Sequence, residues 1–202
     1  MHDRSGVPPL PFEVDVYHLS VVLISIMSAL WPPPVPPVSE RWRAWPVARV
    51  FPVTVPGVSP SGARVTYVLA GVAPEAPCRV AFQAAAVRPG CRTALRATYA
   101  DSTQTFVATV GIAVLDGPGP GGHAAGRPAT VRPVAFPGGP AERFGDRQYF
   151  TGALVASGER YLVATAAGYA DGRSYQPGDN LTPRLRDAAR QLAAALHRAL
   201  TR

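Results

Sequence analysis

The sequence predicts an α+β domain with a mainly antiparallel sheet, a short helix and a C-terminal amphipathic helix. From Arg49 onward, apolar residues come in short β-branched runs that alternate with polar ones, and a period of two is typical of strands. Residues that favour turns separate these runs. After Pro183 the period changes, because leucine and alanine recur every three or four positions, as on one face of a helix.

Tight turns join some of the predicted strands. Residues 100–103 (Ala-Asp-Ser-Thr) and 157–159 (Ser-Gly-Glu) each separate two runs, as the turn of a hairpin does. A short helix is expected from Pro77 to Val87, because proline is favoured in the first turn of a helix and Pro89-Gly90 would end it. The runs that we interpret as strands are 48–55, 63–71, 91–99, 105–115, 130–136, 148–156 and 160–169.

The C-terminal helix is expected to start with Thr182 as its cap and Pro183 at its first position. One stripe is apolar and the opposite face is polar, so we expect the helix to pack on the sheet. A groove on a partner or an anionic membrane surface is the alternative. The stripe consists of Leu185, Ala189, Leu192, Leu196 and Leu200, and the polar face of Arg186, Arg190, His197, Arg198 and Thr201.

A weak internal repeat suggests two β-α-β-β units within the globular domain, which we assign to residues 45–202. The triplet Val-Ala-Thr occurs at 107–109 and again at 163–165, each time on the second strand of a predicted hairpin. Between the halves, residues 116–128 are rich in glycine and proline and are predicted to form a mobile loop.

An apolar segment, residues 16–31, stands between an N-terminal tail of residues 1–15 and a proline-rich spacer of residues 32–44. It favours a single-pass membrane or signal-anchor helix, although it is shorter than the roughly 20 apolar residues of a typical span. A cleaved signal peptide, a buried segment and a mispredicted start, with Met27 as the true first residue, are the alternatives. The prolines that follow favour an extended, semi-rigid spacer.

Cys78 and Cys91 are the only two cysteines of the chain. Without a third cysteine or nearby histidines, they fit one disulfide better than a zinc site. A disulfide implies an oxidising compartment, so we expect a single-pass protein of the cell membrane with its domain outside the cytoplasm. Two free, buried cysteines are the alternative. The arginines after the apolar segment favour a cytoplasmic domain instead.

All 20 basic residues are arginine, and the net charge is +7. Abundant alanine, glycine and proline accompany them, a composition typical of a high-GC genome. The arginines are scattered along the chain and are not interleaved with aromatic residues, as they would be in a nucleic-acid platform. They favour a solvated surface, and nucleic acid is not an expected partner.

The sequence carries no motif of a catalytic, cofactor or metal site, such as G-x-S-x-G, a P-loop, H-E-x-x-H or C-x-x-C. Asp171, Asp179 and Asn180 offer oxygen ligands for Ca²⁺ in a polar stretch, but an Asx-rich turn before the helix is the favoured interpretation. His123 joins Asp171 and a serine in a catalytic triad only if folding brings them together. We therefore predict no catalytic residue, cofactor or metal.

Several segments resemble a group of uncharacterised single-pass membrane or secreted proteins from high-GC actinobacteria. The segments are WPVARVFPVTV (45–55), RATYAD (96–101), FVATVGIAVL (106–115) and YLVATAAGYADGR (161–173), together with the cysteine pair around a short helix. The resemblance implies a single-pass membrane protein or a secreted protein, and it transfers no activity and no site residues.

Together these features favour a membrane-anchored module outside the cytoplasm that binds a ligand or an envelope protein, or has a structural role there, without catalysis. Residues 16–31 would contact the membrane. One alternative is a small hydrolase-like enzyme whose site is assembled by folding. The other is a basic cytoplasmic protein that binds nucleic acid or anionic lipid.

Overall fold

The computed structural model of the chain describes residues 41–59, 62–83, 90–117, 131–145, 149–151, 155–156, 160–174, 176 and 178–201. All of them belong to one unit, Pro36–Arg202. The predicted tail, the apolar segment and most of the spacer lie outside the described residues, as does nearly all of the predicted loop. Within the described part of the chain, no helix has both the length and the apolar content needed to cross a bilayer.

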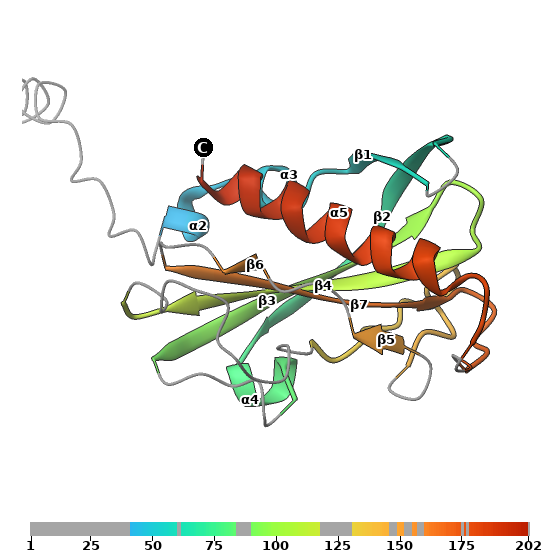
Figure 1. The fold of residues 1–202 in the computed structure, drawn as a ribbon. Coiled ribbons are helices and arrows are strands. Elements are labelled where there is room, and N and C mark those ends of the chain that lie inside the picture. Colours follow the sequence, from blue (N-terminus) through green and yellow to red (C-terminus); the bar gives the residue numbers. More distant parts are fainter. Residues whose placement is uncertain are drawn as a thin grey trace, which may run out of the picture. The chain divides into compact units, whose positions relative to one another are not determined.

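The fold is α+β, as predicted, and its centre is an antiparallel sheet (Figure 1). The strands follow the order β1-β2-β3-β4-β7-β5, and β6 also pairs with β7. Neighbouring strands are antiparallel in every described pair. The strands are β1 (Thr54–Val58), β2 (Arg64–Ala76), β3 (Cys91–Asp101), β4 (Phe106–Leu115), β5 (Tyr149–Thr151), β6 (Val155–Ala156) and β7 (Tyr161–Tyr169).

Two short helices before the sheet replace segments that were expected to be extended. α2 (Arg41–Ala44) occupies the end of the predicted spacer. α3 (Val47–Val50) occupies the first part of the segment 48–55, so the prediction of a strand is wrong for that part. Pro46 stands at the N-cap of α3, and its carbonyl accepts the Arg49 N–H at 2.9 Å. The end of α3 is buried in the core on one face of the sheet, and β1 begins only afterwards.

The helix predicted from Pro77 to Val87 is shorter than expected. α4 (Cys78–Ala81) ends before Phe82, whose backbone is already extended. Phe82 forms an isolated bridge with Val131, and this pairing is incompatible with a longer helix. Residues 84–89 lie outside the described part.

The strand predicted at 130–136 is wrong, because the described residues 131–136 lie across a face of the sheet and are not one of its strands. Their pattern is strand-like, yet the strands beneath them, β3 and β4, already pair with neighbours on both sides and leave no edge free. The second β-α-β-β unit lacks its first strand, so the fold does not reproduce the internal repeat.

Two buried threonines hold this crossing segment, residues 131–136, on the sheet. The Thr98 hydroxyl donates to the Val134 carbonyl at 2.7 Å, and the Val134 N–H donates to Thr109 Oγ1 at 2.9 Å. The two hydroxyl oxygens are 2.8 Å apart. Because Thr98 has one proton and directs it to Val134, Thr109 donates to Thr98.

Two glycines allow the crossing segment to approach the sheet closely. A Cβ atom on Gly111 would lie 2.5 Å from Val131 Cγ2, and one on Gly71 would overlap the Phe136 ring. The missing side chains therefore provide the space in which Val131 and Phe136 pack.

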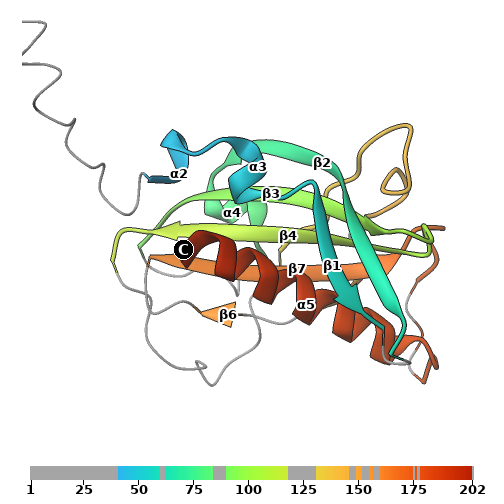
Figure 2. The same cartoon turned by 90° about the horizontal axis from the view of Figure 1, so that it is seen from above.

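The C-terminal helix α5 (Thr182–Thr201) covers the other face of the sheet, where it contacts β7, β4 and β1 (Figure 2). Thr182 is not its cap, contrary to the prediction: it is the first helical residue, and its hydroxyl donates to the Asp179 carbonyl at 2.7 Å. Asp179 forms the Asx turn before the helix, because its Oδ1 accepts the Leu181 N–H at 2.9 Å. The predicted apolar stripe is confirmed as buried: Leu185, Ala189, Leu192, Leu196 and Leu200.

The predicted disulfide is confirmed. Cys78 at the start of α4 is bonded to Cys91 at the start of β3, with 6.2 Å between the Cα atoms. Both cysteines pack in an apolar cluster with Phe82 and Val131, on the face of the sheet opposite α5. The bond therefore ties α4, which directly follows β2, to the beginning of β3.

Candidate functional site

An open groove lies between the edge strand β1 and α5. Its volume of about 420 Å³ falls in the usual range for small-molecule sites. Four of its lining residues are exposed, so the groove is open to solvent. The lining residues are Pro56, Gly57, Val58, Arg64, Gln191, Ala194 and Arg198.

A side-chain clip bridges the two walls of the groove. Gln191 Oε1 accepts the Val58 N–H at 2.6 Å, and Gln191 Nε2 donates to the Val58 carbonyl at 2.5 Å. The carboxamide thus makes the pair of hydrogen bonds that a neighbouring strand would make. Gly57 leaves room for the carboxamide in this position, because a Cβ atom there would lie 2.5 Å from Gln191 Oε1.

The groove is positively charged. Arg64 and Arg198 are both exposed, and no acidic residue is among the described residues that line the groove. Among the residues that the structure describes, neither guanidinium has an ion-pair or hydrogen-bond partner. Guanidiniums without a counter-ion are suited to binding an oxyanion.

A second, much smaller cavity shares Val58 with the groove. Its volume is about 10 Å³, and Tyr67, Asp101, Arg184 and Asp187 are among its lining residues. That volume holds about one water molecule. Ionisable groups of the kind that a hydrolase uses converge here, but the cavity has no room for a substrate.

The ionisable groups of this small cavity have structural partners. Asp101 accepts the N–H groups of Thr105 and Phe106 at 2.8 and 2.9 Å, which fixes the turn between β3 and β4. Burial, as the main cause, raises the pKa of Tyr67 to about 12; Asp101 and Asp187 add to the shift. Tyr67 is therefore neutral at physiological pH.

The residues predicted for a polar site are brought together only in part. Asp171 and Asp179 both lie in the connection between β7 and α5, where each has a different partner. Asp171 pairs with Arg173 at 3.8 Å, whereas the Tyr169 hydroxyl donates to Asp179 Oδ2. The Arg173 guanidinium lies 4.0 Å from the centre of the Tyr169 ring. Asn180 is exposed.

These contacts support the interpretation as an Asx-rich turn. The hydrogen bond from Tyr169 is the main cause that holds the pKa of Asp179 below its usual value, and the Leu181 N–H contributes. Burial and the same hydrogen bond raise the pKa of Tyr169 to about 12. In the described ranges, no three His, Cys, Asp or Glu side chains gather closely enough to hold a metal ion. His123 lies outside those ranges.

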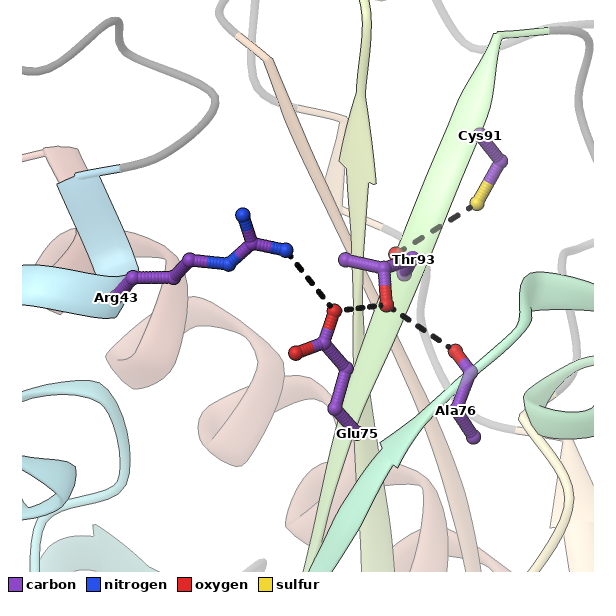
Figure 3. Close-up of polar contacts among 5 residues, drawn as sticks. All are labelled: Arg43, Glu75, Ala76, Cys91 and Thr93. Carbon is purple, nitrogen blue, oxygen red and sulfur yellow. Dashed lines mark hydrogen bonds and ion pairs between the residues drawn. The ribbon is translucent and has the colours of Figure 1, made fainter.

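A polar network joins α2 to the ends of β2 and β3 near the disulfide (Figure 3). The Thr93 hydroxyl donates to Glu75 Oε1 at 2.7 Å, and that oxygen lies 3.6 Å from the Arg43 guanidinium. The Cys91 sulfur lies 3.9 Å from the Thr93 carbonyl oxygen. Because the disulfide leaves this sulfur without a proton, we interpret the last contact as van der Waals packing. The network is a structural link rather than an open site.

No sequence pattern predicted the groove. Arg198 belongs to the predicted polar face of the C-terminal helix, but nothing in the local sequence marks Arg64 or Gln191. The clip joins residues 133 positions apart in the chain, Val58 and Gln191, so local spacing gives no sign of it. Gly57 is a usable signal, since glycine in a strand often marks a place where another group approaches closely.

Comparisons with known protein families, with curated proteins and with solved structures find no match.

Proposed function

We propose that this chain is a membrane-anchored binding module whose domain lies outside the cytoplasm, and that it acts without catalysis. The groove between β1 and α5 carries the proposal, because it combines a ligand-sized volume of about 420 Å³ with two arginines that have no described partner. The small cavity beside it has room for one water molecule only. Binding is therefore the chemistry that this surface supports best.

The proposed location rests on the disulfide and on the apolar segment. The Cys78–Cys91 bond is typical of an oxidising compartment. The apolar residues 16–31 are the proposed anchor, and the proline-rich residues after them would act as a spacer between membrane and domain.

Surface labelling in intact cells tests the location. We suggest the full-length variant Asn180→Cys, because Asn180 is exposed and the native cysteines are bonded to each other. A maleimide that cannot cross membranes should label this variant in intact cells and should not label the wild-type chain. The wild-type chain should react only after unfolding in a reductant. Labelling that requires cell lysis would place the domain in the cytoplasm and refute the proposed location.

The anchor is tested separately by membrane fractionation. The full chain should stay in the membrane pellet after an alkaline carbonate wash, and a chain without residues 16–31 should not. Complete release of the full chain by the wash would refute the anchor and leave the groove unaffected.

A further inference from the structure

We propose that the groove between β1 and α5 binds a ligand that carries phosphate groups, with Arg64 and Arg198 as its recognition residues. This inference deepens the proposed function and rests on the groove being the binding site. It names the chemical class of the ligand, which the fold alone does not assign.

The groove is poorly suited to binding a peptide as an additional strand. Alternate residues of an edge strand direct their N–H and C=O groups outward, and on β1 the Gln191 clip shows that Val58 is one of them, as Pro56 therefore is. Val58 already bonds through both groups to Gln191, and proline has no N–H. Along the groove, an added strand would find only the Pro56 carbonyl where it needs a regular ladder.

The remaining recognition chemistry is that of the two guanidiniums. Gln191, Ala194 and Arg198 line one wall at helical spacing, and Arg64 lies opposite Val58 on the neighbouring strand β2. Arg198 follows Gln191 by seven positions, about 10 Å along a helix axis. Arg64 pairs with the strand residue that Gln191 clips, so the two arginines approach the groove from different ends.

The charge of the groove favours phosphate over a single carboxylate. Two positive charges face the groove without an acid among its described lining residues, and a phosphate monoester carries about −1.5 to −2 at neutral pH. A guanidinium also forms paired hydrogen bonds to phosphate oxygens. The one acidic residue of α5, Asp187, lines the small cavity together with Arg184, which is itself positively charged.

Binding of inorganic triphosphate to the full-length chain tests this inference. The chain is reconstituted in nanodiscs of neutral lipid, and affinity is measured by calorimetry at constant ionic strength. Arg64→Ala and Arg198→Ala should each weaken triphosphate binding by about two- to fivefold, as expected for exposed ion pairs. Arg190→Ala is the matched control, because Arg190 is exposed on the same helix and does not line the groove.

The outcomes separate the alternatives. An equal loss in Arg190→Ala would show diffuse attraction by net charge and would overturn the site. Equal or tighter binding of the dicarboxylate suberate would overturn the choice of phosphate. An absence of triphosphate binding by the wild-type chain, shown to be folded by a cooperative thermal unfolding curve, would overturn it as well. None of these outcomes depends on the side of the membrane on which the domain lies. The test of the ligand is therefore independent of the maleimide labelling that tests the location.

A further arm distinguishes a lipid headgroup from a soluble phosphate ester. In nanodiscs that contain phosphatidylglycerol, a headgroup seated in the groove would compete with triphosphate and lower its apparent affinity. Arg64→Ala should reduce that competition if the lipid occupies the groove. An apparent affinity that is the same in both lipids would identify a soluble phosphate ester as the ligand.

Discussion

Replacing Thr98 by valine should destabilise the fold more than replacing Thr109. Both hydroxyls are fully buried, and the direction of their protons follows from the hydrogen bonds to Val134. Thr98→Val leaves the Val134 carbonyl and the Thr109 hydroxyl proton without partners. Thr109→Val leaves only the Val134 N–H. A buried group without its partner costs about 1–3 kcal/mol, so we expect about 2–4 kcal/mol for Thr98→Val and about 1–2 kcal/mol for Thr109→Val.

Urea unfolding of the full-length chain in a neutral detergent, followed by far-ultraviolet circular dichroism, measures these values. Valine preserves the shape of threonine, so the difference reports the hydrogen bonds and only little of the packing. Thr54→Val on the exposed edge strand is the control and should change stability by less than about 0.5 kcal/mol. If the two buried variants also stay within that limit, or if Thr109→Val is the more damaging one, the threonines do not hold the crossing segment as described.

Three further predictions concern the disulfide, the packing under the crossing segment and the response to alkali. Cys91→Ser should lower the free energy of unfolding by about 3 kcal/mol, the value expected for a loop of this length; urea curves that coincide with those of the oxidised wild type would contradict it. Gly111→Ala should cost about 1–3 kcal/mol because its methyl group meets Val131, whereas Gly139→Ala, with open space around it, should be nearly neutral in the same thermal unfolding assay. The raised pKa of Tyr67, about 12 against an ordinary 10, means that the unfolded chain loses this proton first. Its contribution to stability is therefore complete below pH 10 and falls by about 1.4 kcal/mol per pH unit between the two pKa values, a loss that Tyr67→Phe should reduce in urea curves on either side of pH 10.

The fold class was predictable because the relevant patterns are local. Short runs rich in apolar and β-branched residues mark β3, β4 and β7, and the spacing of leucines marks α5. The disulfide was predictable because the chain has only two cysteines and no histidines near them that would complete a zinc site. Each of these inferences uses neighbours in sequence, or counts that do not depend on the fold.

The crossing segment and the groove were not predictable in the same way. Residues 131–136 have the composition of a strand, but β3 and β4 beneath them are already paired on both sides and cannot accept another strand. The groove depends on β1 and α5, which stand at opposite ends of the domain's sequence. Asp179 shows the intermediate case: its role in the turn before α5 was expected from local chemistry, but its bond to Tyr169 was not.

The position of the disulfide has a mechanical consequence for a chain that is tethered by its N-terminus, as we propose. The chain between the tether and the sheet passes through α2, whose Arg43 contacts Glu75 at the end of β2. Glu75 is bonded to Thr93, two residues after Cys91. These side chains connect α2 to the end of the β2–β3 pair that the covalent bond already holds together. Peeling these strands apart from that end would require stretching a sulfur–sulfur bond rather than breaking hydrogen bonds one by one.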